Sequence, residues 1–480
     1  MSKKTITILI CIIIFPVLTS LACLSGVREK ISDQVSDFVD DQVGEVLEEV
    51  VEEIVPQTEE EAIPTEALPT EAPLVEEPTP QVAISNEKQD LIMLDISTWI
   101  QDADTVFVAY LFQNPNSSYM FEDAEFSFYL FDSNGMEIGS NEYYVSQIYP
   151  DEKIGIVFNY YLPDAQTIVD SISVEWDIEN TVPAQGMVNP LSPSTINFWP
   201  SGGYPVVTGS IENSSSSILT NIQTNIVCYN SAGEIVGGGS TYVDFVPNGA
   251  QVGFSNYVEA FEDVALVEAY PYMTYGSMVI DDPDAWTKIS VIEDNFYQGT
   301  YNWVYGGAVI RNDTADFLED SVFFATFYDS SGKVVTVASA YIDFLFPGEI
   351  LGFAPWIYSL PEDALMTTSE IWVLPGRVTD TYELSSNPFV VNSTELIGDY
   401  QDTVLVNFTN TYSKQVSEVE VFVIVRNASG EIIGGGSDWT DEPTPAGGMS
   451  SSEVYISVES GETIATIEAW VLPSFWTNFE

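Results

Sequence analysis

Residues 86–480 repeat one pattern four times, and this repeat constrains the fold more than any other feature of the sequence. A glycine ends a short polar turn in every copy, at Gly135, Gly233, Gly332 and Gly430, with spacings of 98, 99 and 98 residues. Upstream, an asparagine closes an apolar run at Asn114, Asn213, Asn312 and Asn410, and downstream a proline follows at Pro150, Pro247, Pro347 and Pro445. Landmarks that keep one period predict four equivalent domains, which we place at 86–186, 187–287, 288–385 and 386–480.

A glutamate with an aromatic residue close behind it ends each copy. The pairs are Glu175 with Trp176, Glu268 with Tyr270, Glu370 with Trp372, and Glu468 with Trp470. We interpret this pair as a fourth landmark of the same repeat.

Within a copy, apolar residues recur with a period of two, which is typical of β-strands. In the first copy, strands are predicted near 94–99 and at 105–112, 125–131, 136–148, 154–161 and 172–176. Six or seven strands in about 98 residues, with a turn every ten or so, predict an all-β fold of four tandem immunoglobulin-like β-sandwiches. Each copy is expected to hold a core of its own, so that 288–385 folds alone.

One strand and its turn carry a family resemblance. Phe128 to Asp132, followed by Ser-Asn-Gly, resembles the motif that names the FxLYD domain, an immunoglobulin-like module of unknown function in exported bacterial and archaeal proteins. The other copies have degenerate versions at 226–230, 325–329 and 423–427, and the glycine-rich stretches from 237 and 434 resemble the family's second hairpin. The resemblance covers most of 86–480 and implies a fold, but it implies no chemistry.

The N-terminus has the form of an export signal. Lys3 and Lys4 precede an apolar run from Ile6 to Leu21, and Ala22 precedes Cys23. The stretch 19–23 resembles the lipobox of bacterial lipoproteins, which implies a signal peptide at 1–22 and a lipid on the Cys23 thiol. An uncleaved signal anchor is the alternative. Both place the rest of the chain outside the cytoplasm, because the lysines stay inside.

Two segments are expected between this anchor and the repeats. Within 23–55, apolar residues from position 29 onward recur at spacings of three and four, which predicts an amphipathic helix with ten acidic residues on its polar face. Residues 56–85 are rich in proline, glutamate and threonine, and we expect a disordered, extended linker there. Such a linker holds the four repeats away from the membrane.

Composition excludes several classes of function. The chain has no histidine, which rules out Ser-His-Asp and Cys-His catalysis and His-ligated metals. With 12 Lys and Arg against 73 Asp and Glu, the net charge of -61 argues against nucleic-acid binding. Cys228 lies in an apolar strand and is expected to be a buried, inert thiol. We therefore expect no enzymatic activity and no cofactor.

Two weak candidate binding sites stand out from this background. Asp281, Asp282 and Asp284 cluster between the second and third copies, where calcium binding is one interpretation and a solvated loop the other. The turn at 132–135 begins like a calcium loop, but it lacks the glutamate that such a loop needs at its twelfth position, and a hairpin turn explains it better. Asp244, Asp343 and Asp441 occupy one repeat position and are expected to face outward.

The C-terminal seven residues hold three aromatic side chains, Phe475, Trp476 and Phe479. One interpretation is that they fold back and cap the last sandwich. The other is that they form a ligand-binding surface at the tip furthest from the membrane.

These features predict a non-enzymatic cell-surface lipoprotein whose four domains serve display, adhesion or scaffolding. Its partners would be the membrane, through the N-terminal lipid, and an extracellular protein or glycan. The alternative is a lipoprotein that captures carbohydrate or another solute on exposed aromatic residues; aromatic side chains at outward strand positions would favour it.

Overall fold

We analysed a computed structural model of the protein, which describes residues 88–94, 96–200, 205–299, 302–355, 360–379, 384, 386–398, 402–440 and 443–479. Residues 84–480 form one compact unit. The predicted signal peptide, Cys23, the acidic helix and the linker lie outside the described residues.

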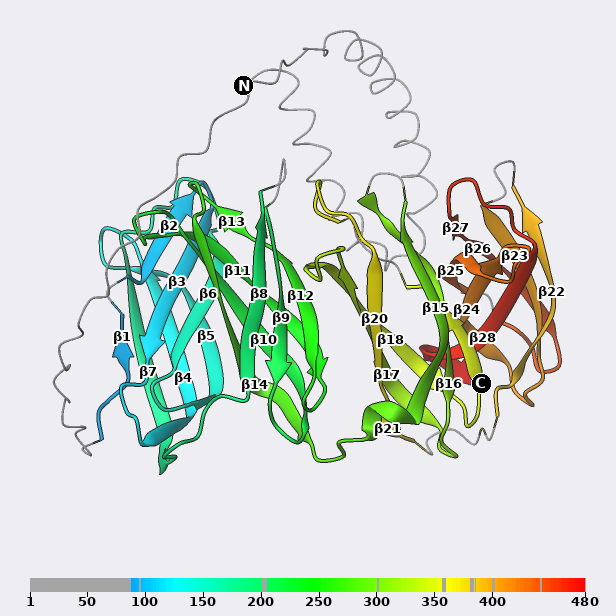
Figure 1. The fold of residues 1–480 in the computed structure, drawn as a ribbon, viewed down its shortest axis with the longest axis horizontal. Helices are drawn as coiled ribbons and strands as arrows, with labels where there is room; N and C mark the ends of the chain where they lie inside the picture. The colour runs from blue at the N-terminus through cyan, green and yellow to red at the C-terminus, as the bar shows by residue number, and fades with distance from the viewer. Residues whose placement is uncertain are drawn as a thin grey trace, which may run out of the picture. The chain divides into compact units, whose positions relative to one another are not determined.

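The described residues are almost entirely β-strand, as predicted, and their one helix is the short 3-10 helix η1 (Ala285–Lys288). The strands form eight antiparallel sheets, which follow one another in pairs along the chain (Figure 1). Each pair makes a β-sandwich, and we number the sandwiches 1 to 4. The prediction of an all-β fold made of several sandwiches is confirmed.

The six main strands of each sandwich are called a to f in chain order. Sandwich 1 consists of β1 (Ile92–Met93) and β2 (Thr98–Asp102) as strand a, β3 (Thr105–Gln113), β4 (Tyr119–Phe131), β5 (Glu137–Ile148), β6 (Lys153–Tyr161) and β7 (Ser171–Pro183). Sandwich 2 consists of β8 (Leu191–Trp199), β9 (Val206–Asn213), β10 (Ile218–Tyr229), β11 (Ile235–Val246), β12 (Gln251–Tyr257), the short β13 (Glu259–Ala260) and β14 (Leu266–Ile280).

The last two sandwiches have the same strand order. Sandwich 3 consists of β15 (Ile289–Gln298), β16 (Val304–Asn312), β17 (Leu318–Tyr328), β18 (Val334–Leu345), β19 (Ile350–Phe353), β20 (Thr368–Leu374) and the short β21 (Arg377–Val378). Sandwich 4 consists of β22 (Phe389–Ile397), β23 (Thr403–Asn410), β24 (Val416–Arg426), β25 (Ile432–Thr440), β26 (Met449–Tyr455), the short β27 (Ser457–Val458) and β28 (Thr466–Phe479). In every sandwich, strands a, b and e form one sheet, the abe sheet, and strands d, c and f form the other, the dcf sheet.

Successive sandwiches pack sheet against sheet. The abe sheet of sandwich 1 meets the dcf sheet of sandwich 2 through β6, β10, β11 and β14. Sandwiches 2 and 3 meet through β9, β12, β17 and β18, and sandwiches 3 and 4 through β16, β19, β24 and β25. The inner sheets are therefore covered on both faces. Every residue of β10 except Asn221 is buried, whereas β23, in the last sheet of the series, alternates buried and half-buried residues.

Each sandwich has an apolar cluster of its own, as expected, but the clusters of the first three sandwiches also include residues of the next sandwich. Phe324 and Leu374 of sandwich 3 belong to the apolar cluster of sandwich 2, and Phe422 and Leu472 of sandwich 4 belong to that of sandwich 3. The sequence signal for such strands is an unbroken apolar run, as in Val421 to Val425, because a strand covered on both faces has no polar side.

The repeated asparagine joins the two sheets of each sandwich. Asn312, at the end of strand b, is fully buried, and its amide donates to the carbonyls of Asp316, Leu345 and Phe346 at 2.9, 3.2 and 3.0 Å. Its side-chain oxygen accepts the N–H of Thr314 at 3.0 Å. Asn114, Asn213 and Asn410 make the equivalent bonds. One side chain thus satisfies main-chain groups where the chain passes from one sheet to the other.

The repeated glycine belongs to a hairpin turn between strands c and d, as predicted. Asp132 accepts the N–H groups of Asn134 and Met136 at 2.8 and 2.9 Å, and Gly135 has a φ of +74°. The fourth landmark holds in three copies only. In sandwiches 2, 3 and 4, the glutamates Glu268, Glu370 and Glu468 pair with the residue of strand c that lies six positions before the turn glycine. In sandwich 1, Ser173 pairs with the equivalent residue of strand c, and Glu175 lies two residues further along strand f.

We predict that Asn312→Ala lowers the free energy of unfolding by about 3 kcal/mol, because the buried carbonyls of Leu345 and Phe346, the carbonyl of Asp316 and one N–H group lose their partner. Calorimetry of the soluble unit 84–480 measures this as a lower melting temperature of the transition that includes sandwich 3. The exposed Asn392 donates only to Thr409, so Asn392→Ala is the control, with an expected loss below about 0.5 kcal/mol. Equal effects of the two changes would contradict the role of Asn312 in joining the two sheets.

Candidate functional site: the junction between sandwiches 2 and 3

Junctions 1/2 and 3/4 share a contact between an aromatic ring and a glycine. Tyr270 of sandwich 2 lies over Gly155 of strand e in sandwich 1, and a Cβ on this glycine would stand 2.7 Å from the ring. Trp470 of sandwich 4 lies over Gly352 of sandwich 3 in the same way, with a Cβ distance of 2.3 Å. A side chain at either glycine would collide with the ring, so these two positions require glycine.

A half-buried glutamate holds each of the same two junctions. Glu152 accepts the N–H of Tyr149 and the side-chain amide of Asn189, both at 2.6 Å. The Asn189 amide also reaches the carbonyl of Pro271 in sandwich 2 at 3.3 Å.

The glutamate of junction 3/4 repeats this arrangement 197 residues later. Glu349 bonds the N–H of Phe346 and the amide of Asn387, which also reaches the carbonyl of Val471. In sandwich 2, Ala250 stands at this position: its carbonyl accepts the N–H of Asn213, as that of Glu152 accepts the N–H of Asn114. Junction 2/3 therefore lacks this contact.

A four-residue excursion in strand f is the third shared feature. In sandwich 2, residues 274–277 leave the sheet, and the ring of Tyr275 lies 5.8 Å from that of Tyr144 in sandwich 1. In sandwich 4, residues 474–477 do the same, and the ring of Phe475 lies 5.3 Å from that of Phe344 in sandwich 3.

The C-terminal aromatic segment is therefore part of a junction. The N–H of Phe475 donates to Asp343 of sandwich 3 at 3.0 Å, and the strand continues to Phe479, which pairs with Val416. The side chains of Trp476 and Phe479 lie outside the described residues. For Phe475, this placement supports the interpretation that the segment folds back rather than forming a free binding surface. The ring packs on sandwich 3, however, and not on the last sandwich as expected.

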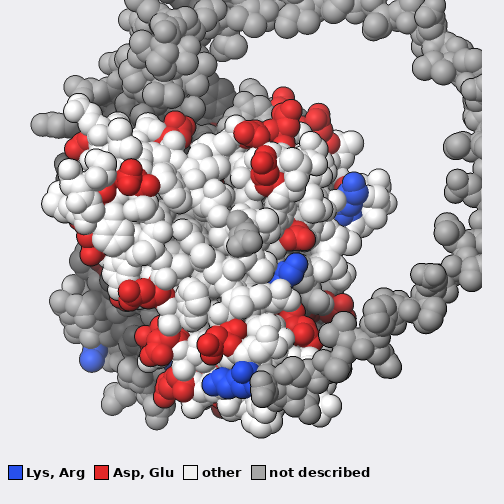
Figure 2. Space-filling model, turned by 90° about the vertical axis from the view of Figure 1, so that its left-hand side faces the viewer, with Lys and Arg blue, Asp and Glu red and all other residues white. Residues whose placement is uncertain are grey.

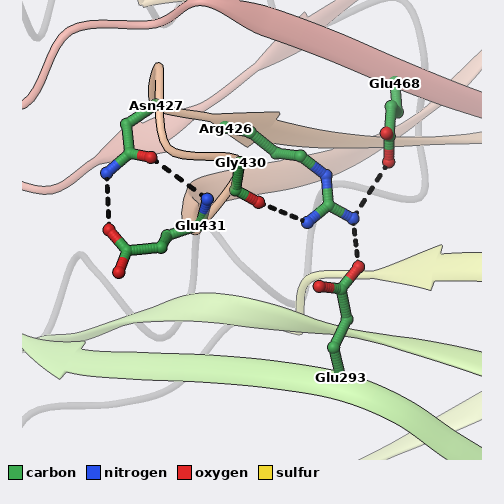
Figure 3. A network of polar contacts seen from close by, with 6 residues as sticks. All are labelled: Glu293, Arg426, Asn427, Gly430, Glu431 and Glu468. Carbon is green, nitrogen blue, oxygen red and sulfur yellow. Dashed lines mark hydrogen bonds and ion pairs between the residues drawn. The ribbon is translucent and has the colours of Figure 1, made fainter.

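An arginine completes junction 3/4 (Figure 3). Arg426 is nearly buried and forms ion pairs with Glu293 of β15 in sandwich 3 and, at 3.2 Å, with Glu468 of β28. These carboxylates raise the pKa of the Arg426 guanidinium, chiefly through the hydrogen bond that Arg426 donates to Glu293. The neighbouring turn is closed by Asn427, which bonds Glu431 through both its side-chain atoms.

These correspondences show a larger repeat of about 197 residues. The turn begins with aspartate in sandwiches 1 and 3, at Asp132 and Asp329, and with asparagine in sandwiches 2 and 4, at Asn230 and Asn427. The short strands β13 and β27 occur only in sandwiches 2 and 4 among the described residues. The unit is thus two two-sandwich pairs in series, and junction 2/3 joins the pairs.

Junction 2/3 uses different contacts. The hydroxyl of Thr208 donates to the carbonyl of Val334 at 2.6 Å, and the N–H of Gly253 donates to Thr326 at 2.9 Å. Asp244 accepts the hydroxyl of Tyr341 at 3.2 Å.

The aspartate position of strand d was expected to face outward, and the structure corrects this. Asp244 accepts the hydroxyl of Tyr341 in sandwich 3, and Asp343 accepts the N–H of Phe475, because the strand f excursion of sandwich 4 reaches back to strand d of sandwich 3. Asp441 lies outside the described residues.

Two large hollows flank η1 at junction 2/3. The first has a volume of about 560 Å³; both cationic and acidic groups line it, among them Lys288, Arg377, Asp282 and Asp320. The second has a volume of about 450 Å³ and is lined by Trp286, Trp372, Glu370 and apolar side chains of β15 and β20. The hollows at junctions 1/2 and 3/4 have about 260 and 30 Å³. We take junction 2/3 as the candidate site.

The aspartates proposed for calcium do not converge. Asp282 forms an ion pair with Lys288 at 2.7 Å, Asp281 accepts the hydroxyl of Ser217 at 2.9 Å, and Asp284 precedes η1. No group of three or more Cys, Asp or Glu side chains in the described part of the chain could hold a metal ion. Cys228 is buried, and burial raises the pKa of its thiol to about 12.

The repeat region as a whole is strongly acidic. Residues 86–480 contain 56 acidic and 8 basic residues. Figure 2, which views the molecule from the side of sandwich 1, shows acidic side chains spread over that face with few basic ones. Anionic ligands are therefore repelled at long range.

Comparisons with known proteins add no relative: no protein-family model matches the sequence, and no curated protein is significantly similar to it. Within the described residues, we find no helix that is both long and apolar enough to span a bilayer.

We predict that the protein becomes more stable as the pH falls from about 8 to about 5. Burial raises the pKa of Glu152 to about 7, and burial together with Asp343 raises that of Glu420 to about 8. The folded state therefore holds protons that the unfolded chain releases above its usual carboxyl pKa, and this stability is lost as the pH rises through the folded values.

Thermal melting between pH 5 and 8 checks this dependence. Glu152→Gln should flatten it, whereas Glu142→Gln, at an exposed position in β5, should not. A melting temperature that increases with pH in this window would contradict the assignment.

Proposed function

We propose that the protein is a non-enzymatic lipoprotein of the cell surface, anchored through Cys23, whose four sandwiches act as one display, adhesion or scaffolding body. The observation that supports it most is the continuous packing between sandwiches. Each inner sheet is covered by the next sandwich, so the chain offers a single preformed body rather than separate beads. Preformed surfaces lose little conformational freedom on binding.

The two junction glutamates support a structural role as well. Glu152 and Glu349 both have a raised pKa, which is also common in active sites. Here, however, each bonds a main-chain N–H group and an asparagine amide at a sandwich junction. Their surroundings explain the pKa shifts without catalysis.

The export signal supplies the location in this proposal. The resemblance of residues 19–23 to a lipobox places the lipid on Cys23, and the proline-rich stretch 56–85 would carry the sandwiches away from the membrane.

We predict that labelled fatty acid is incorporated into the wild-type protein and not into Cys23→Ser, and that antibodies against 84–480 label intact cells. Cys228→Ser is the control, because this thiol is buried in β10, and it should keep the label. If the wild-type protein takes up no label, the lipoprotein assignment is wrong and the N-terminal segment is an uncleaved signal anchor. Sandwiches inaccessible on intact cells would refute surface display.

A further inference from the structure

Trp372 is the one described member of a repeated contact that has no glycine to cover. It pairs with the residue of strand c that lies eight positions before the turn glycine, and Tyr270 and Trp470 do the same in sandwiches 2 and 4. Those two rings lie over Gly155 and Gly352 of the preceding sandwich.

The glycine that would receive Trp372 is occupied by other side chains. Gly253 of sandwich 2 instead faces Thr326 and Val337, with a Cβ distance of 2.5 Å to Thr326. The indole of Trp372 lies beside that of Trp286 from η1, with ring centres 5.1 Å apart and planes at 76°.

This displaced indole lines the 450 Å³ hollow, whose volume lies within the roughly 300–1,000 Å³ of pockets that hold small ligands. The apolar residues Ile289, Val291, Ile371 and Val373 also line it, together with Thr287 and Ser290. The indole N–H of Trp372 is buried and has no hydrogen-bond partner in the protein. Glu370 is exposed at the same hollow, and its carboxylate accepts the hydroxyl of Tyr328 at 3.0 Å.

The chemistry of these groups selects among ligand classes. The lining contains no Lys or Arg, and residues 86–480 carry 56 acidic against 8 basic residues, which disfavours phosphates, sulfates and carboxylates. A quaternary ammonium ion would suit the indoles and Glu370, but it offers no acceptor to the Trp372 N–H. A pyranose can use the indole ring, the indole N–H and the carboxylate. Its C–H face packs on an indole, one hydroxyl accepts a hydrogen bond from the N–H of Trp372, and another hydroxyl donates to the carboxylate of Glu370.

We propose that the hollow between Trp286 and Trp372 binds a neutral saccharide. The inference deepens the proposed function by giving the surface body a ligand class. It depends on sandwiches 2 and 3 alone, so it can fail while the lipid anchor holds, and it can hold while the anchor fails.

The test uses the soluble unit 84–480, titrated with neutral oligosaccharides of β-1,4-linked glucose, α-1,4-linked glucose and β-1,4-linked N-acetylglucosamine. Binding is followed by calorimetry and by tryptophan fluorescence. At least one series should bind and change the fluorescence. Trp372→Phe keeps a ring but removes the N–H donor, and it should weaken binding about five-fold or more. Trp439→Phe, at an exposed position in β25, is the matched control and should leave binding unchanged.

A second variant protects the test against a folding defect. Glu370→Gln keeps an oxygen that can accept from Tyr328, and its melting temperature should stay close to wild type while saccharide binding weakens. Tetramethylammonium chloride is titrated in parallel. The proposal is overturned if no saccharide binds, if binding is the same in Trp372→Phe and Trp439→Phe, or if only the ammonium ion binds.

Discussion

The structure depends on sheets that are buried on both faces. Such a sheet has no polar side, so its side chains must be apolar or must find hydrogen bonds across the junction, and the backbone must leave room for the facing sandwich. At junctions 1/2 and 3/4, the glycines Gly155 and Gly352 leave this room, and Tyr270 and Trp470 fill it. Because a Cβ at either glycine would stand against the ring, packing of the two sandwiches is coupled to a single small residue in strand e.

Two further contacts separate these junctions from the central one. Each has a glutamate that bonds an asparagine of the connecting segment, and each has a strand f excursion that reaches back to the preceding sandwich. At junction 2/3 the glutamate is replaced by Ala250, and the receiving face presents Thr208 and Ser210. The molecule thus combines two pairs that share these junction contacts with a central junction of a different kind, where hollows of about 560 and 450 Å³ lie.

Much of the fold could be predicted from the sequence, and most of the site could not. The 98-residue period, the hairpin turns at Asp132 and its equivalents, and the importance of Asn114 and its equivalents follow from local patterns that one chain displays four times. The alternation of aspartate and asparagine at the turns was also visible, but only the junction contacts give the 197-residue period a meaning. Trp372 looked like its equivalents, and its different environment depends on a contact between distant strands that no local pattern records.

Thermal unfolding of fragments of matched length tests most directly whether the pair of sandwiches is the unit of stability. Residues 288–480 contain sandwiches 3 and 4, and 187–385 contain sandwiches 2 and 3; both are compared with sandwich 3 alone, 288–385. We expect one cooperative transition for 288–480, at a higher temperature than for the other two fragments. The pairing of sandwiches would be contradicted if 187–385 were equally stable, or if 288–385 alone melted as high as 288–480.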